Sequence, residues 1–204
     1  MPILLKPLAG NPPITQRFGE NPAGYPLTHG HNGVDYGVPM GTPVHAAAAG
    51  LVTMAEMDLT GYGNCIRIQH VDCLTIYGHL DSFAVKRDDI VSPGELIGYS
   101  DNTGHSTGPH LHFELRLASS IQSAVDPLPY LVDSLPVAPL FRVRVLCSDG
   151  LNIRIGPGLT FSKIGILKQG SELDAQQIAG DFWLRVPQGF ICGRLNGQNF
   201  ITIL

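Results

Sequence analysis

Residues 104–117 read GHSTGPHLHFELRL, and the alternation within this stretch indicates how the chain folds. Successive side chains of a strand point to opposite faces, so His110, His112 and Glu114 are expected on one face and the apolar residues between them on the other. The sequence therefore predicts a strand with one core face and one face that carries chemistry. The alternative is a surface strand with two solvated histidines. It would not explain why the small residues 106–109 form a tight loop that leads into the strand.

A second motif, HNGVD, occupies residues 31–35. Its spacing places His31 and Asp35 on one side of either a helix or a strand, and Gly33 and Gly37 disfavour the helix. An imidazole and a carboxylate are ordinary zinc ligands, and one more imidazole would complete a catalytic site that keeps a position for water. On its own, this spacing is a weak signal.

His79 closes the apolar strand predicted at residues 73–80, in the sequence YGHL. Considered alone, such a histidine is a structural residue that hydrogen-bonds to the backbone. Beside the other two motifs, it is a fourth imidazole able to orient an attacking water or to stabilise an oxyanion. All eight histidines precede Phe113, so we expect the chemistry in the first part of the chain.

The composition predicts a mostly β protein. Of 204 residues, 44% are hydrophobic and 15% are charged, which indicates a folded globular chain. The 24 glycines and 16 prolines are dispersed, which is typical of short strands joined by tight turns. We expect an antiparallel meander over residues 14–117, with residues 42–56 as one of its strands and with Cys65 facing Tyr77 in a hairpin over residues 63–79. An extended connector marked by the prolines of 127–139 is expected to follow. The later strand-sized segments fit a small barrel, so the predicted domains are residues 1–134 and 141–204, with a linker at 135–140.

The charge differs between these parts. Residues 1–134 carry 6 Lys and Arg against 13 Asp and Glu, whereas residues 135–204 carry 7 against 4. An acidic unit joined to a basic one suits a catalytic domain with a module for an anionic surface, although a net charge of this size can equally be incidental. We expect no nucleic-acid partner.

The four cysteines show no Cys-x-x-Cys spacing. A hairpin over residues 63–79 would separate the sulfurs of Cys65 and Cys73 by roughly 13 Å, so we expect both to be reduced thiols. For Cys147 and Cys192, buried free thiols are the default expectation.

The motifs HNGVD, YGHL and GHSTGPHLHFEL, with QRFG before them and GVPMGTPVHAAAAG and YGNCIRIQH between them, resemble the lysostaphin-type (LytM-type) zinc endopeptidases that cut peptidoglycan peptides. The resemblance covers roughly residues 14–117. It implies that His31, Asp35 and His112 hold one Zn²⁺ per catalytic domain. Two imidazoles and one carboxylate make a nitrogen-rich site, which favours zinc over magnesium.

The resemblance also implies that His110 and His79 are catalytic. Some members use a tyrosine six residues before the first ligand to stabilise the oxyanion, and Tyr25 holds that position here. The five key positions follow the family pattern, which argues against the non-catalytic relatives that have lost ligands and act as activators. The remaining histidines match no key position and are expected on the surface or in the core: His29, His45, His70 and His105.

The second part of the chain resembles bacterial SH3-like wall-binding domains. The similarity lies in DGLNIRIGPG at residues 149–158, in KIGILKQGSEL, and in FWLRV around Trp183. The usual closing Gly-Trp-Val is replaced by Gly189, Phe190 and Ile191, which puts the wall affinity or the binding groove in question. Alternatively, this module only packs against the catalytic domain and binds nothing.

These features predict a monomeric peptidoglycan endopeptidase that uses a zinc-activated water to hydrolyse amide bonds in stem or cross-bridge peptides. A phage endolysin is one protein of this kind. Two alternatives stay open. The first is a non-catalytic, metal-stabilised protein that binds the wall or activates an amidase. The second is a closed structural site formed by His31, Asp35, His110 and His112.

The N-terminus, MPILLKPLAG, has an apolar stretch too short for the core of a signal peptide, and no later run could span a bilayer. We therefore expect no membrane insertion, and action on the bacterial wall outside the cytoplasm. The chain is expected either to begin at a mature terminus or to leave the cell by lysis, as phage-encoded wall hydrolases do.

Overall fold

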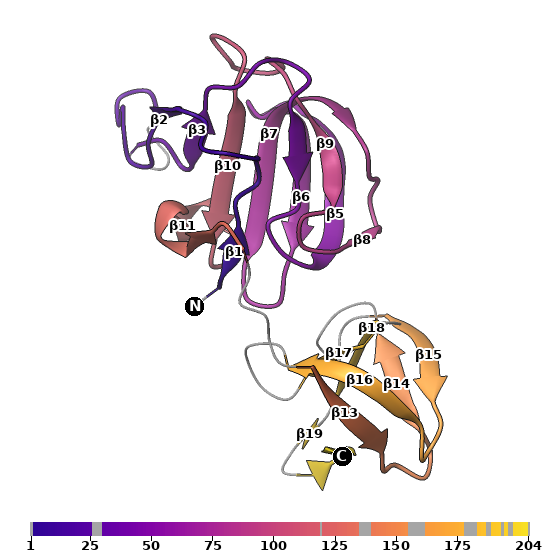
Figure 1. Cartoon of the computed structure of the whole chain (residues 1–204). Coiled ribbons are helices and arrows are strands. Elements are labelled where there is room, and N and C mark those ends of the chain that lie inside the picture. Colours follow the sequence, from indigo (N-terminus) through magenta and orange to yellow (C-terminus); the bar gives the residue numbers. More distant parts are fainter. Residues whose placement is uncertain are drawn as a thin grey trace. The chain divides into compact units, whose positions relative to one another are not determined.

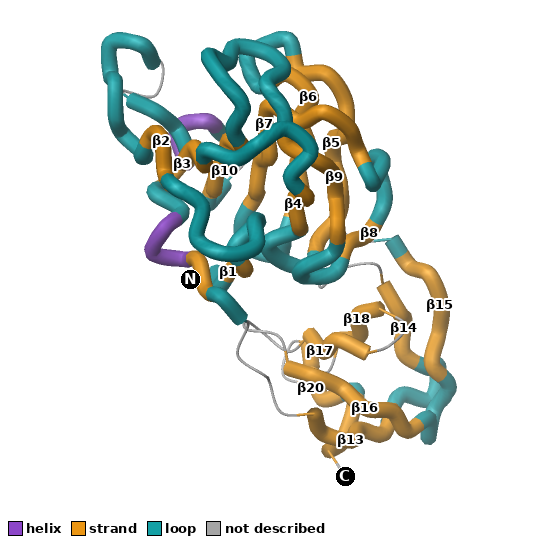
Figure 2. The backbone as a smooth tube through the Cα atoms, turned by 45° about the horizontal axis from the view of Figure 1, so that its top comes forward, coloured by secondary structure: helices purple, strands orange, loops and turns teal. Residues whose placement is uncertain are grey.

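The computed structural model forms two compact units, Met1–Leu135 and Pro136–Leu204. The structure describes residues 2–25, 30–118, 120–134, 140–154, 162–177, 183–186, 189–192, 194–195 and 198–203. The prediction of a mostly β protein is confirmed, with 49% strand and 4% helix, and strands dominate both units (Figures 1 and 2). Among the described residues, no helix has the length and hydrophobicity needed to cross a membrane.

The first unit is built on one ten-stranded sheet whose strand pairs are all antiparallel. Its main path runs β2 (Ile14–Gln16), β3 (Val34–Tyr36), β10 (Leu111–Arg116), β7 (Leu74–Phe83), β6 (Gly63–Gln69), β5 (Gly50–Asp58) and β8 (Ile90–Val91). Off this path, β4 (Pro43–His45) pairs with β9 (Leu96–Ser100), β9 also pairs with β7, and β11 (Ala124–Val125) pairs with β10.

The predicted meander is wrong in its order, because β10 lies between β3 and β7 (Figure 1). A meander would leave this late strand at the edge of the sheet. All six residues of β10 are buried, and an edge position would expose one row of their backbone groups. The inner position pairs both edges of β10 and brings it beside β3, the strand of the first motif.

Two smaller expectations also differ from the structure. Residues 42–56, expected as one strand, form β4 and β5 with a bend between them, where Ala46 and Ala47 are fully buried. The prolines at 127 and 129 do not belong to an extended connector. Pro127 immediately precedes a short 3-10 helix (Leu128–Tyr130), and Pro129 lies within it. This helix precedes β12 (Leu131–Val132), which pairs in parallel with β1 (Leu4–Leu5). A second 3-10 helix spans Ile121–Ser123.

The predicted two faces of the His-x-His strand are confirmed. Leu111, Phe113 and Leu115 are fully buried in the hydrophobic core of the first unit, where the Phe113 ring lies 5.3 Å from that of Tyr77. The other face of β10 carries buried polar side chains, so the alternative of a solvated surface strand is wrong.

The hairpin β6–β7 forms with a register one residue away from that expected. Ile66 pairs with Tyr77, and a bulge lies at Cys65. Cys65 and Cys73 are buried free thiols, which confirms the expectation for this pair.

The second unit contains a seven-stranded antiparallel sheet. Its order is β15 (Lys163–Leu167), β14 (Leu151–Arg154), β18 (Gly189–Cys192), β17 (Trp183–Val186), β16 (Glu172–Gln177), β13 (Leu140–Val145) and β21 (Ile201–Ile203). A small separate pair joins β19 (Arg194–Leu195) and β20 (Gln198–Asn199). In β13, Val143 and Val145 are buried while Arg142 and Arg144 are exposed, as the period-two alternation predicts. The expected linker, apart from Leu140, and residues 155–158 of the SH3-like motif lie outside the described residues.

Candidate metal and catalytic site

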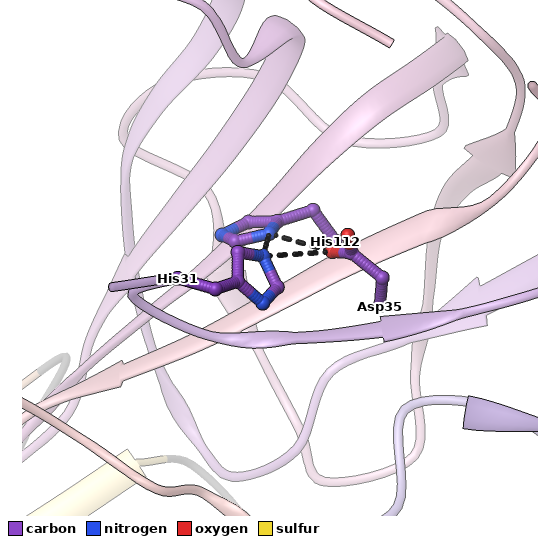
Figure 3. Close-up of side chains that lie close together, drawn as sticks. All are labelled: His31, Asp35 and His112. Atoms are coloured by element: carbon purple, nitrogen blue, oxygen red, sulfur yellow. Dashed lines mark hydrogen bonds and ion pairs between the residues drawn. The ribbon is translucent and has the colours of Figure 1, made fainter. Parts of the chain in front are cut away.

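The three side chains expected to be ligands converge in the first unit (Figure 3). Asp35 on β3 and His112 on β10 are cross-strand partners, and His31 lies in the turn that leads into β3. His112 Nδ1 is 2.8 Å from Asp35 Oδ1. His31 Nε2 is 3.0 Å from His112 Nδ1 and 3.1 Å from Asp35 Oδ1. All three residues are buried.

Local backbone contacts position His31. Gly30 has a φ of +140°, and a Cβ there would come within 2.4 Å of the Gly19 carbonyl oxygen, so only glycine allows the two segments to pass this closely. The Gly19 amide donates to the His31 carbonyl at 2.8 Å, and the His31 amide donates to Glu20 O at 2.7 Å. The ring then places Nδ1 3.2 Å from the carbonyl of Arg17.

The donor atoms of this trio face one another in the way that ligands face a shared cation. A carbonyl oxygen only accepts hydrogen bonds, so His31 carries its proton on Nδ1 and presents the Nε2 lone pair. His112 Nδ1 faces that lone pair and the carboxylate of Asp35. Donors around a tetrahedral zinc with bonds of about 2.0–2.1 Å are roughly 3.3 Å apart, close to the separations observed here. The donor set therefore fits one zinc ion.

The pKa shifts of Asp35 and His112 also indicate that this site stabilises positive charge. Burial would raise the pKa of Asp35, but hydrogen bonds to His112 and His31 and their charges hold it well below its usual range. Burial would lower the pKa of His112, but its contacts with Asp35 and Glu114 raise it to about 9. Metal uptake at neutral pH therefore releases a proton from this site.

His79 lies beside the trio, inside β7 rather than at its end as expected. Its φ of +61° is unusual for a residue other than glycine. Here β7 changes partner: residues 74–78 pair with β10, and residues 80–83 pair with β9. The ring donates Nδ1–H to Thr103 O at 2.7 Å. Burial, with smaller contributions from the neighbouring imidazoles, lowers the pKa of His79 to about 4, so its Nε2 carries a lone pair at neutral pH.

His110 faces the same space. Its Nδ1 is 2.8 Å from Gly108 O and 3.1 Å from Ser106 Oγ, so the proton again lies on Nδ1. Its Nε2 is 3.6 Å from Asp35 Oδ2, the oxygen that the two ligand imidazoles do not contact. The ring centroids of His79 and His110 are 4.5 Å apart.

The loop that holds His79 through the Thr103 carbonyl passes close to a second loop at Gly104. Gly104 has a φ of +75°, and a Cβ there would lie 2.4 Å from both Gly61 O and Gly63 N. We expect Gly104→Ala to displace Thr103, whose carbonyl orients His79, and to lower turnover by about 100-fold, since a misplacement of about 1 Å has that cost. Steady-state rates at saturating metal measure this.

The matched control is Gly41→Ala. Gly41 has a φ of +78°, but a Cβ there would meet nothing within 4 Å, so the substitution carries the left-handed backbone strain without the clash. Equal activity of the two variants would show that the crossing does not position His79.

The remaining residues named in the sequence analysis are Tyr25 and the four histidines outside the key positions, and they do not share one location. The Tyr25 ring lies 5.3 Å from the ring of His31, and its hydroxyl is 3.3 Å from Gln16 Oε1. His70 is a buried core residue, with Nδ1 2.8 Å from Ala49 O and Nε2 2.8 Å from Thr75 Oγ1. The partly buried His45 lies on β4, and His105 is exposed. His29 lies outside the described residues.

A polar cluster behind His112 has no counterpart in the sequence prediction. It contains Asn32, Tyr62, Glu114 and Arg116, joined by hydrogen bonds. Glu114 is fully buried and Arg116 is 5% exposed. The period-two spacing that placed Glu114 on the histidine face extends to Arg116 and could have indicated the pair. The contribution of Asn32 and Tyr62, which lie far away in sequence, could not be inferred from spacing.

The fold and site thus define a metallopeptidase-like β-sheet domain, and comparisons identify its family. The model of peptidase family M23 matches residues 29–127. The catalytic domain of the antimicrobial peptidase lysostaphin from Staphylococcus simulans is 37% identical, with a TM-score of 0.55 over 59% of this chain and 92% of that domain. The chain belongs to peptidase family M23.

Two further matches are a curated relative and a whole solved protein. Peptidoglycan DD-endopeptidase ShyA of Vibrio cholerae is 46% identical over 86 residues, which are 42% of this chain and 20% of that protein. Whole lysostaphin from S. simulans is 26% identical, with a TM-score of 0.55 over 95% of both chains. The matched region spans 20% to 33% of the length of the curated relatives.

Proposed function

We propose that this chain is a zinc-dependent endopeptidase that hydrolyses amide bonds in the stem or cross-bridge peptides of bacterial peptidoglycan. His31, Asp35 and His112 are the metal ligands. The observation that carries this proposal is the convergence of three buried donor atoms within 3.1 Å of one another, next to two further imidazoles whose ring nitrogens are already oriented. When bound, zinc supplies a Lewis acid that activates water and polarises the scissile carbonyl.

His79 and His110 handle protons beside the metal. Each ring is held by an Nδ1–H bond to a backbone carbonyl, so each directs Nε2 away from its anchor. A neutral Nε2 accepts a proton from the attacking water. Once protonated, the same nitrogen donates to the oxyanion of the tetrahedral intermediate or to the leaving amine. The low pKa of His79 keeps it in the accepting form at neutral pH.

Tyr25 is a further candidate for binding the oxyanion. Its ring lies against that of His31, and its hydroxyl donates to Gln16 Oε1 at 3.3 Å, a contact that it would exchange for the oxyanion. Burial and the negative charge of Asp35 raise the pKa of Tyr25, which keeps the hydroxyl protonated and able to donate.

The substrate assignment rests on the relatives. ShyA is named as acting on peptidoglycan, and lysostaphin as an antimicrobial peptidase. By this proposal the chain acts on the cell wall outside the cytoplasm, as a monomer. Residues 141–204, which belong to the second unit, form an SH3-like wall-binding domain. This role is supported by the short antiparallel strands and by the match to whole lysostaphin over 95% of the chain. Release by lysis, as for a phage endolysin, belongs to the same proposal.

Purified peptidoglycan from walls of several cross-bridge types tests this function. Incubation with the full chain and zinc should create new amino termini, and mass spectrometry of the released fragments should identify the bond cut. The same incubation with a chelator should release nothing. Binding to the wall without any new amino terminus would support the non-catalytic alternative and exclude the peptidase.

A further inference from the structure

The four imidazoles of the site do not present the same nitrogen. His31, His79 and His110 each place Nδ1 against a backbone carbonyl, and so each presents Nε2. His112 is reversed, because its Nδ1 faces Asp35 and His31. A neutral imidazole carries one N–H, so a ring that ligates through Nδ1 must carry its proton on Nε2.

Among the described residues, the Glu114 carboxylate is a candidate acceptor for the proton on His112 Nε2. Within the described part of the chain, Nε2 is fully buried and has no hydrogen-bond partner. The Glu114 carboxylate lies 3.6 Å away, at Oε2. Gly33 leaves the ring its space, since a Cβ there would come within 3.0 Å of Nε2. A buried N–H needs an acceptor, and a shift of a few tenths of an ångström closes this contact.

Glu114 is held at this distance by a cluster whose hydrogen-bonding capacity is nearly filled. Asn32 Nδ2 donates to Glu114 Oε2 and to the Tyr62 hydroxyl, both at 2.6 Å. The Tyr62 hydroxyl donates to Glu114 Oε2 at 2.7 Å and accepts from an Arg116 nitrogen at 3.0 Å. Arg116 Nε donates to Glu114 Oε1.

The count of donors leaves room for one more. Three groups donate to the Glu114 carboxylate, two to Oε2 and one to Oε1. A carboxylate offers about four acceptor positions, so one is left, and a small turn of the carboxylate presents it to His112. The positive charge of Arg116 balances the negative charge of the buried carboxylate. The Tyr62 ring also lies 5.5 Å from the His112 ring and limits its rotation.

We propose that Glu114 is the positioning residue of this metal site: it accepts the Nε2–H of His112 and thereby fixes Nδ1 as the ligand atom. Tyr62, Asn32 and Arg116 hold Glu114 for this task. The inference rests on the proposed function, because it concerns one of the ligands proposed there. Such partners of ligating histidines typically change metal affinity by about 10–100-fold when they are removed.

The first test is zinc affinity of the full chain, measured by competition with a chromogenic chelator. Glu114→Gln offers one oxygen in place of two and turns an amide NH₂ toward a donor, so zinc affinity should fall by about 10–100-fold. Tyr62→Phe keeps the ring but removes the central hydroxyl, and a loss in the same direction is expected. Tyr62→Phe carries the test if Glu114→Gln does not fold.

Thr75→Val is the matched control. Thr75 is fully buried and its hydroxyl joins His70 to Tyr77, so its loss breaks a buried network of the same domain that is separate from the Glu114 cluster. Its zinc affinity should stay within twofold of that of the wild type. A loss equal to that of the Glu114 variant would mean that general destabilisation explains both and would overturn the proposal.

The second readout is the tautomer of His112 in ¹⁵N-labelled, zinc-loaded protein. Long-range ¹H–¹⁵N correlations should show a protonated Nε2 and a metal-bound Nδ1. Zinc bound to Nε2, or wild-type zinc affinity in both Glu114→Gln and Tyr62→Phe, would refute the positioning role of Glu114. Neither result would contradict the proposed function. If the wild-type chain binds no zinc, the proposed function fails and the inference fails with it.

Discussion

Replacing His112 with alanine is expected to abolish both metal retention and wall hydrolysis. His112 supplies one of three proposed donor atoms and contacts both of the others. Structural zinc sites bind with about 10–16 kcal/mol, so each of four ligands contributes roughly 3 kcal/mol, and losing one should weaken zinc binding by about 10²–10³-fold. Metal analysis after dialysis and clearing of wall suspensions measure the two effects.

His45→Ala serves as the control for this substitution. His45 lies on β4, outside the ligand trio, and is only partly buried. This variant should keep its zinc and clear wall suspensions at the wild-type rate. A His112→Ala protein with full rate and full zinc content would show that His112 is not a ligand.

Replacing His110 with alanine is expected to separate catalysis from metal binding. His110 Nε2 approaches the second oxygen of Asp35 at 3.6 Å, and its Nδ1 is anchored on Gly108 O, so we assign it to proton transfer. General acid–base groups contribute about 10²–10⁴-fold to rate. The variant should lose turnover on that scale while its zinc affinity stays within about threefold of the wild-type value.

The closed-site alternative makes the opposite forecast for the same protein. If His110 were a fourth ligand, His110→Ala should lose zinc by about 10²–10³-fold, as His112→Ala does. Chelator competition on the two variants in parallel therefore distinguishes a site that keeps a position for water from one that is closed by protein ligands.

Strands with a clear two-residue alternation of apolar and polar side chains are predicted best from the sequence. Alternation in residues 110–115 predicted which side of the strand enters the core, and the same logic held for β13. The predicted sheet order is wrong because β10 pairs with β3, about eighty residues earlier in the chain, and a local sequence pattern does not indicate which distant strands pair. The register of β6–β7 differs by one residue because Gln69 pairs with Leu74, which centres the turn between Val71 and Asp72. The bulge at Cys65 shifts the pairing only beyond this stretch.

The linear order of amino acids was enough to infer the kinds of residue needed for the chemistry and their place in the His-rich first part of a β chain. Imidazole and carboxylate side chains have fixed chemical capacities, and strand alternation is a local property of the backbone. The nitrogen that each imidazole presents could not be inferred. Carbonyls at Arg17, Thr103 and Gly108 set three of the rings, and the Glu114 cluster faces the fourth. Most of these contacts join residues that meet only when the sheet is assembled.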